Sequence, residues 1–393
     1  MPIASWNPEE ALAEMIQHLA DINMLYLFGV MVVAIGILGK SADWMVEKAV
    51  TLSLRTGMPK VIVGATIVSV GTTFPEAVVS VLAALNGNPD IALGNAVGSV
   101  ICDAGLILGT ACLIAPLPLN KKVVNRQGWV QFGAGVVLVL FCLPYTDLGN
   151  VFETKATLPQ WAGFILVAGL VVYMIWSVRL AKLADPDEGS EEAEDDSPVT
   201  ILVGSILVGC LFVVASSITL IEATKILASE AGIPEAVIAS TLVAFGTSLP
   251  ELVTAVTATR KGQGELAVGN VIGADILNVL FVAGAAAAIT SGGLVAEPIF
   301  FKLQFPAMLI ILLCFRIGIY AAKDGKLSRP FGAFLVAVYV IYGVLNAMFG
   351  KTEEAAFGPG ENGRGDRNHK ALTIELVEET AILRPEDAAN ALF

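Results

Sequence analysis

Ten segments of this chain carry apolar runs of about 20 residues, the length at which an α-helix crosses the hydrocarbon core of a membrane. Backbone that crosses lipid must satisfy its own hydrogen bonds, so only helices and closed barrels can do so. A barrel would show short segments of alternating polarity, which are not seen here. The sequence therefore predicts an all-α integral membrane protein with ten transmembrane helices, at residues 23–39, 60–85, 91–115, 127–144, 159–180, 198–225, 236–259, 265–290, 298–320 and 330–349.

Composition agrees with this prediction and argues against a soluble globular protein. Hydrophobic residues make up 55 % of the chain and charged residues 15 %, and the mean hydropathy is +0.75. Soluble domains carry about 25 % charged residues. The lipid bilayer is therefore the expected surroundings of most of the chain, and no nucleic acid partner is expected.

Basic residues are concentrated in alternate loops between the predicted helices, and such loops face the cytoplasm in most membrane proteins. We therefore expect a multi-pass protein of the cell membrane, or of the inner membrane in a Gram-negative bacterium, with both termini outside. The intervening loops hold almost no Lys or Arg beyond Lys155 and Lys225. The basic loops contain Lys40, Lys48, Arg55 and Lys60; Lys121, Lys122 and Arg126; Arg179 and Lys182; Arg260 and Lys261; and Lys323, Lys326 and Arg329.

Two stretches of the chain repeat each other at an offset of 175 residues. Residues 57–103 align without a gap with residues 232–278, and about a third of the positions are identical. Chance similarity between apolar segments would match Leu, Val and Ala, whereas these copies also share glycine, proline, glutamate and asparagine in register. The pattern indicates an internal duplication.

The two copies are predicted to run in opposite directions through the membrane. The loop before the first copy is basic and therefore cytoplasmic, whereas the loop before the second, "EAGIPE", is acidic and therefore external. Inverted-topology repeats with helices interrupted at matching places are typical of secondary transporters, which bind their substrate where the repeats meet. The sequence thus favours a transporter with kinked helices at its binding site.

Each copy places a proline and a glutamate inside an apolar segment, in "GTTFPE" (71–76) and "GTSLPE" (246–251). A proline leaves the carbonyl four residues earlier without its helical donor, and residues three or four apart share a helix face. An alternative is that the glutamates are protonated and only bond helices together. The candidate ligands are Ser69, Gly71, Thr72, Thr73 and Glu76 in the first copy, and Gly246, Thr247, Ser248 and Glu251 in the second.

The helix that follows each glutamate adds polar residues at a spacing of four. If each pair of helices packs antiparallel, these groups converge with the glutamates into one cluster that holds up to three carboxylates. Oxygen ligands of this kind suit Ca²⁺ and Na⁺ better than a soft metal. The single hydroxyls and the first asparagine of each set can equally serve to pack helices together. The residues are Asn95, Ser99 and Asp103 in the first copy, and Asn270, Ala274 and Asn278 in the second.

The paired motifs "GTTFPE…GNAVGSVICD" and "GTSLPE…GNVIGADILN" resemble the two repeats of the Ca²⁺/cation antiporter superfamily, in particular prokaryotic Na⁺/Ca²⁺ exchangers. The resemblance implies alternating-access exchange of Ca²⁺ for Na⁺, without ATP or a cofactor, with Glu76 and Glu251 as central ligands for both ions. It further implies Ca²⁺ ligands at Thr72 and Thr247, flanking Na⁺ ligands at Thr73 and Ser248, and a completed cluster through Asp103 and Asn278.

Two positions depart from the pattern of the exchangers that the chain resembles. Asp103 and Asn278 are exchanged between the repeats relative to archaeal exchangers, which keeps the charge but moves it across the site. Ala274 stands where the first copy has Ser99, which weakens one Na⁺ site and leaves Na⁺ and H⁺ both open as the coupling ion. A Ca²⁺/H⁺ antiporter of the same fold is therefore the alternative function.

Other classes of function have less support in the sequence. Channels usually build their filters by symmetry around a pore, whereas these repeats are inverted. An enzyme is not expected, because we find no nucleophile with its base, no phosphate loop and no zinc motif. The sequence leaves the oligomeric state open, a monomer included. The expected organisation is an N-terminal surface helix (1–22), a first membrane half (23–180), an acidic cytoplasmic linker (181–197), a second membrane half (198–350) and an extramembrane tail (351–393).

Overall fold

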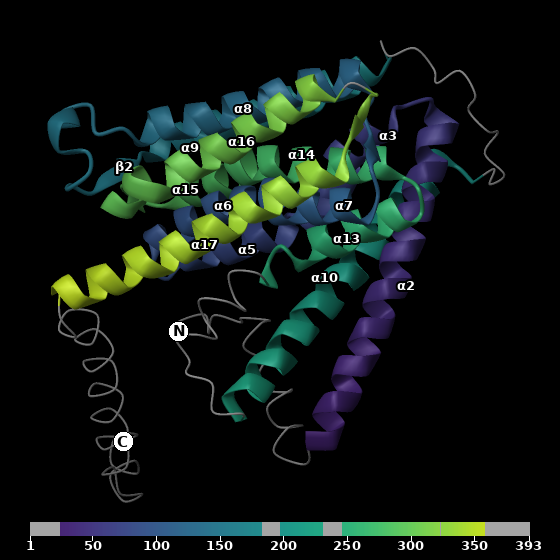
Figure 1. Ribbon diagram of the computed structural model, residues 1–393, viewed down its shortest axis with the longest axis horizontal. Coiled ribbons are helices and arrows are strands. Elements are labelled where there is room, and N and C mark those ends of the chain that lie inside the picture. Colours follow the sequence, from purple (N-terminus) through teal and green to yellow (C-terminus); the bar gives the residue numbers. More distant parts are fainter. Residues whose placement is uncertain (1–23, 183–196, 231–245, 323, 358–393) are drawn as a thin grey trace, which may run out of the picture. The chain divides into compact units, whose positions relative to one another are not determined.

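The computed structural model describes residues 24–182, 197–230, 246–322 and 324–357, and these residues are mostly helical (Figure 1). The chain divides into two compact units, Met1–Ile341 and Tyr342–Phe393. The predicted surface helix at 1–22 lies outside the described residues, as do residues 183–196 of the acidic linker and the tail from residue 358 onward. The boundaries predicted for those segments stay predictions.

The first half of the described chain, residues 24–182, is built from helices with short π-helical segments between them. Two of its helices are interrupted, one between Lys60 and Leu85 and one between Pro89 and Ile114. The elements are α2 (Met24–Thr56), α3 (Lys60–Val63), η1 (Gly64–Val68), α4 (Ser69–Thr72), α5 (Phe74–Leu85), α6 (Pro89–Cys102), η2 (Asp103–Ile107), α7 (Leu108–Ile114), β1 (Leu117–Pro118), α8 (Lys121–Cys142), η3 (Leu148–Asn150), β2 (Ala156–Leu158) and α9 (Gln160–Lys182).

The second half, residues 197–357, follows the same order with small differences. Residues 231–245, which include the start of the second sequence copy, lie outside the described residues, so the elements of that copy are given only from Gly246 onward. The elements are α10 (Val199–Glu230), α13 (Leu249–Arg260), α14 (Gly264–Leu277), η5 (Asn278–Ala283), α15 (Gly284–Ile289), β3 (Leu294–Ala296), η6 (Phe300–Gln304), α16 (Phe305–Ala321), β4 (Lys326–Leu327) and α17 (Arg329–Phe357).

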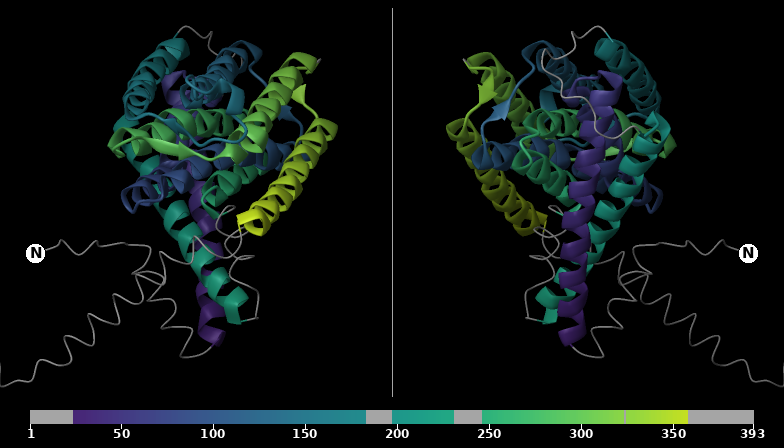
Figure 2. Two further views of the ribbon diagram at one scale, coloured as in Figure 1. Left: turned by 90° about the vertical axis from the view of Figure 1, so that its left-hand side faces the viewer. Right: turned by 90° about the vertical axis from the view of Figure 1, so that its right-hand side faces the viewer.

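Corresponding elements of the two halves begin 175 residues apart, the offset of the sequence repeat. The paired starts are Met24 and Val199 for α2 and α10, Phe74 and Leu249 for α5 and α13, Pro89 and Gly264 for α6 and α14, and Asp103 and Asn278 for η2 and η5. The long helices α2 and α10 lie side by side in Figures 1 and 2. Matching residues therefore begin matching elements.

Seven helices of the described residues are long and apolar enough to cross a membrane, and the bent pair Lys60–Thr72 and Phe74–Leu85 makes eight if it counts as one span. α13 is too short on its own, with 12 described residues. α8 is less apolar because it carries Gln127 and Gln131, which are buried against other helices. The predicted count of ten spans is not established by these helices and stays a prediction.

The first helix is longer than the sequence predicted. A loop was expected after residue 39, but α2 continues to Thr56 and includes Lys40, Lys48 and Arg55. Polar residues in this stretch suggested a loop, yet the buried side chains recur every three or four positions, which is the pattern of an amphipathic helix. They are Ala42, Met45, Val46, Ala49 and Leu52.

The interior of the fold is formed by the spans Pro89–Ile114 and Gly264–Ile289, in which 72 % and 78 % of the most apolar 18-residue stretch is buried. α14 approaches α3 and η1 so closely that side chains cannot fit between them. A Cβ added to Gly64 would lie 2.5 Å from the carbonyl oxygen of Leu266, and one added to Gly273 would lie 2.5 Å from the Cα of Ala65. Glycine is required at these positions, and the close contact brings the two sequence copies together.

Two short antiparallel ribbons join the halves. β1 pairs with β4, with Leu117 opposite Leu327, and β2 pairs with β3, with Thr157 opposite Val295. β1 and β3 follow corresponding spans, α7 and α15, whereas β2 and β4 precede the last helix of each half. The pairing is thus reciprocal, because in each ribbon a strand that follows a buried span of one half pairs with a strand that precedes the last helix of the other half.

Candidate cation-binding site

In both sequence motifs a helix starts at the residue directly before the proline. The first broken helix bends by 43° between Thr72 and Phe74. In the second copy α13 likewise starts afresh at Leu249, directly after Ser248. Pro75 and Pro250 lie at the first helical positions after each break, where a missing backbone N–H costs nothing. The prolines therefore allow each helix to restart beside the polar residues that precede it.

Glu76 and Glu251 lie in the first turns of α5 and α13, where the positive end of the helix dipole favours a carboxylate. Their exposed fractions are 0 % and 1 %. Glu251 Oε1 accepts a hydrogen bond from Thr73 Oγ1 at 3.1 Å, so the first copy contributes a hydroxyl to the glutamate of the second. Glu251 Oε2 and both carboxylate oxygens of Glu76 have no hydrogen-bond partner among the described residues. Buried ionised carboxylates need a positive partner, which a bound cation or a proton would supply.

A reciprocal pair of threonine–asparagine contacts joins the two copies. Thr72 Oγ1 lies 3.4 Å from Asn270 Oδ1, and Thr247 Oγ1 lies 3.4 Å from Asn95 Oδ1. Asn95 also donates from Nδ2 to the carbonyl oxygen of Glu76 at 3.3 Å. Asn270 and Asn95 therefore contact two predicted ligands, Thr72 and Thr247. These contacts agree with the alternative that the two asparagines pack helices together.

Asp103 and Asn278, which occupy equivalent positions in the two copies, contact each other. Asn278 Nδ2 donates to Asp103 Oδ2 at 3.3 Å. Both side chains are buried, and the remaining oxygen of each, Oδ1, has no hydrogen-bond partner among the described residues. Each residue also begins a π-helical segment, a distortion that is frequent at functional sites.

The remaining predicted ligands are placed less uniformly. Ser248 Oγ lies 3.5 Å from Ser99 Oγ, so these two hydroxyls meet across the copies. The Ser69 hydroxyl instead donates to the carbonyl oxygen of Thr66 in its own helix, at 3.3 Å. Gly71 faces the side chain of Cys210. Gly246 faces Ile221 in the same way.

Three buried acidic side chains, Glu76, Glu251 and Asp103, lie close enough for their charges to interact. In the part of the chain that the structure describes, no group of three or more His, Cys, Asp and Glu side chains could hold a metal ion together. Asp103 contacts Asn278, and Glu251 accepts from Thr73, so each of these carboxylates already has one partner from the other copy. A common cluster with Glu76 stays a prediction. A cation here would combine carboxylates with hydroxyl, amide and backbone oxygens.

Sequence reasoning missed one polar residue beside the second glutamate. Thr254 lies one turn after Glu251 on α13, is fully buried, and has a hydroxyl with no hydrogen-bond partner among the described residues. The spacing of three residues from Glu251 was the signal that could have identified it. Val79 stands at the equivalent position of the first copy.

A fourth buried carboxylate, Asp275, contacts a different helix. It accepts a hydrogen bond from Gln131 Nε2 of α8. Gln127, one turn earlier on α8, donates to Ser177 Oγ at 2.7 Å. Asp275 is thus held by α8, and these contacts account for the two buried glutamines of that helix.

Comparison with known proteins gives consistent matches over most of the chain. The family described as sodium/calcium exchanger protein matches residues 26–179 and 201–348. Inner membrane protein YrbG of Escherichia coli is 29 % identical over 81 % of this chain and 96 % of its own length. Sodium/calcium exchanger MaX1 of Methanosarcina acetivorans is 28 % identical over 80 % of this chain and 97 % of its own length.

A solved structure shows the same fold. A structure of the sodium-calcium exchanger NCX_Mj soaked without Na⁺ and Ca²⁺ superimposes with a TM-score of 0.67 at 25 % identity, and it covers 81 % of this chain and 98 % of that chain. The family match spans more than half of the sequence and includes both glutamate motifs. This multi-pass membrane protein belongs to the sodium/calcium exchanger family.

Proposed function

We propose that the protein is a secondary antiporter that exchanges Ca²⁺ for Na⁺ across the cell membrane by alternating access, without ATP or a cofactor. One observation carries the proposal: two buried glutamates lie at matching helix breaks, and three of their four carboxylate oxygens have no hydrogen-bond partner among the described residues. The sodium/calcium exchangers among the matched proteins support the choice of ions.

The proposed ligands are oxygen atoms, the donors that Ca²⁺ and Na⁺ prefer. Glu76 and Glu251 serve both ions. Thr72 and Thr247, with the carbonyls of Gly71 and Gly246, add oxygens for Ca²⁺. The flanking Na⁺ sites use Thr73, Ser248, Ser99 and Ser69, and Asp103 and Asn278 complete the middle of the site.

The proposed architecture has ten transmembrane helices in two inverted-topology repeats, with both termini outside. A two-fold axis produces reciprocal contacts: if a residue of the first copy contacts a residue of the second, the equivalent residues of the two copies contact each other as well. The threonine–asparagine contacts and the two ribbons both have this form. The charges of the loops in the sequence favour an axis in the membrane plane.

Charge compensation provides the proposed coupling. Glu76, Glu251 and Asp103 bring up to three negative charges into the membrane interior, and desolvation makes it unfavourable to leave them bare. One Ca²⁺ with a proton, or about three monovalent cations, would neutralise them. The inward- and outward-facing states then interconvert readily only when the site is occupied, which makes the exchange obligatory.

The test uses purified protein reconstituted in vesicles loaded with Na⁺, and measures the uptake of radiolabelled Ca²⁺. Parallel vesicles without Na⁺ carry only an acid-inside pH gradient. Uptake driven by the Na⁺ gradient alone, abolished in Glu76→Gln and retained in the exposed-loop control Glu153→Gln, is expected. Uptake that needs only the proton gradient would identify a Ca²⁺/H⁺ antiporter instead, and no uptake under either gradient would contradict Ca²⁺ as the substrate.

A further inference from the structure

A small cavity of about 90 Å³ lies between α10 and the two helix breaks. α10 contributes a single face to it, since Ser217, Ile221 and Lys225 are spaced by four residues and Glu222 lies beside them. Pro75 of the first break and Thr247 and Pro250 of the second line the opposite wall. The cavity therefore connects α10 to the residues proposed to bind the cation.

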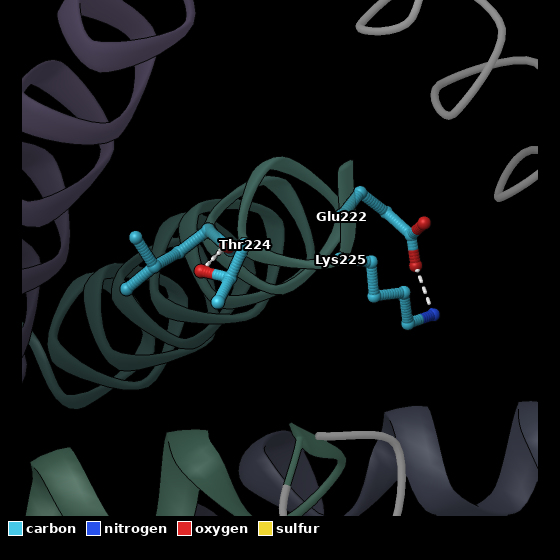
Figure 3. Close-up of polar contacts among 4 residues, drawn as sticks. Glu222, Thr224 and Lys225 are labelled. Carbon is cyan, nitrogen blue, oxygen red and sulfur yellow. Dashed lines mark hydrogen bonds and ion pairs between the residues drawn. The ribbon is translucent and has the colours of Figure 1, made fainter. Parts of the chain in front are cut away.

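An ion pair lines this cavity. Lys225 Nζ lies 2.6 Å from Glu222 Oε1, and the side chains are 29 % and 17 % exposed. Figure 3 shows the two side chains on one side of α10, whereas Thr224 turns elsewhere and donates to the carbonyl oxygen of Leu220 at 2.7 Å. The pair lies near the end of the apolar span Val199–Leu227. A carboxylate in an apolar span is costly, so its position beside a cavity suggests a role in function.

Oxygen atoms continue from this pair toward the site. Ser217, which lines the same cavity, is 1 % exposed, and its hydroxyl has no hydrogen-bond partner among the described residues. Thr247 also lines the cavity, and its hydroxyl contacts Asn95, which in turn donates to the backbone carbonyl of Glu76. A cation that leaves Glu222 would thus meet further oxygens on its way to the glutamates.

We propose that Glu222 is an access site that captures a hard cation, Ca²⁺ or Na⁺, before it reaches Glu76 and Glu251, and that Lys225 neutralises Glu222 when no cation is there. This inference rests on the proposed function. A cation and the Lys225 ammonium compete for the same carboxylate, so the ion pair sets the concentration at which cations enter from this face.

The first half lacks this arrangement. Glu47 of α2 occupies the position equivalent to Glu222, but Val50 stands at the position equivalent to Lys225. Glu47 is also exposed to solvent. The access site is therefore expected to affect transport from one face of the membrane only.

The test compares Glu222→Gln and Lys225→Met with the wild type in proteoliposomes, with Ca²⁺ applied to each face in turn. Glu222→Gln is expected to raise the half-saturating Ca²⁺ concentration about threefold or more on one face, with a smaller effect on the maximal rate. Lys225→Met leaves Glu222 without its competing charge and is expected to lower that concentration about twofold.

The matched control is a second ion pair, Lys155 with Glu297, at 2.7 Å. Lys155→Met and Glu297→Gln are expected to change the half-saturating concentration less than about twofold on either face, because this pair lies outside the cavity.

Two results would overturn the inference, and they are distinguishable. If the wild type exchanges Ca²⁺ and Glu76→Gln does not, but Glu222→Gln keeps the wild-type half-saturating concentration on both faces, the access site is wrong and the proposed function stands. If the wild type transports no Ca²⁺, both fail. Should Glu222→Gln not fold, Lys225→Met decides, since an unchanged or raised half-saturating concentration in that variant contradicts the inference.

Discussion

The two halves of the candidate site share a backbone frame but differ in their side chains. α5 and α13, α6 and α14, and the reciprocal threonine–asparagine contacts match at the repeat offset. In contrast, Thr73 of the first copy bonds to Glu251, whereas its counterpart Ser248 contacts Ser99 and not Glu76. Only the first copy supplies a carboxylate at the position of Asp103. The duplicated elements therefore fix where the proposed ligands lie, while single substitutions decide which half supplies charge and hydroxyl groups.

The largest effects are expected for the paired glutamates. In Glu76→Gln and Glu251→Gln the charge that a cation must neutralise is lost, so Ca²⁺ uptake should fall at least about 100-fold, or about 2.7 kcal/mol. The two variants should also differ in thermal stability when no ions are bound. Glu76 has the more poorly satisfied carboxylate, so thermal unfolding should occur at a higher temperature in Glu76→Gln than in Glu251→Gln. Normal uptake in either variant would contradict the site.

Moving the charge across the site is the next test. Asp103→Asn should weaken Na⁺-driven exchange about 20-fold, or about 1.8 kcal/mol, because one of the charges that cations compensate is lost. The double variant Asp103→Asn with Asn278→Asp restores a carboxylate opposite an amide and should recover to within about threefold of the wild type. The measurement is the Na⁺ dependence of Ca²⁺ uptake, and an unchanged dependence in the single variant would argue against the role of Asp103.

The two serine and threonine hydroxyls provide a smaller and more selective comparison. Thr73→Val removes a hydrogen bond to a carboxylate, and Ser248→Ala removes a weaker contact between two neutral hydroxyls. We expect the half-saturating Ca²⁺ concentration to rise about fivefold in Thr73→Val and about twofold in Ser248→Ala, since hydrogen bonds to charged groups contribute more. Equal effects would mean that the two halves contribute alike despite their different contacts.

The smallest effect is expected where the second copy has lost a hydroxyl. Ala274→Ser restores the residue type found at Ser99, and a new oxygen there should lower the half-saturating Na⁺ concentration about twofold. The Na⁺ titration of Ca²⁺ uptake measures it, with Ala162→Ser of α9, a buried alanine in a helix that carries none of the proposed ligands, as the control. A change that is equal in both variants would show that position 274 has no special relation to Na⁺.

Much of this architecture could be predicted from the sequence, because the residues that carry it have few alternatives. Pro75 and Pro250 restrict where a helix can restart, and a bilayer-length apolar run allows little besides a helix. The register of the duplication relates Glu76 to Glu251 and predicts that the two motifs meet at one site. The match to the sodium/calcium exchanger family agrees with that interpretation.

The contacts of individual side chains could not be predicted in the same way. Whether Ser248 turns to Ser99 or to Glu76 depends on rotamers and on the packing distance between helices, neither of which follows from spacing. The predicted end of the first helix was wrong because charged residues after position 39 suggested a loop. The buried residues from Ala42 to Leu52 instead continue α2 to Thr56. The sequence around Glu222 and Lys225 did not indicate a cation-access site, because the proposed role depends on a cavity that segments distant in the sequence form together.

The contact between Asp103 and Asn278 has a consequence for how such a chain can arise. Positions related by a two-fold axis face their own equivalents at that axis, so a dimer of identical half-length chains would set aspartate against aspartate or asparagine against asparagine. The first repels and the second carries no charge. Joining the halves in one polypeptide releases this restriction and permits a complementary acid and amide. Two sequence copies in one polypeptide thus allow an asymmetry that a dimer of identical chains cannot have.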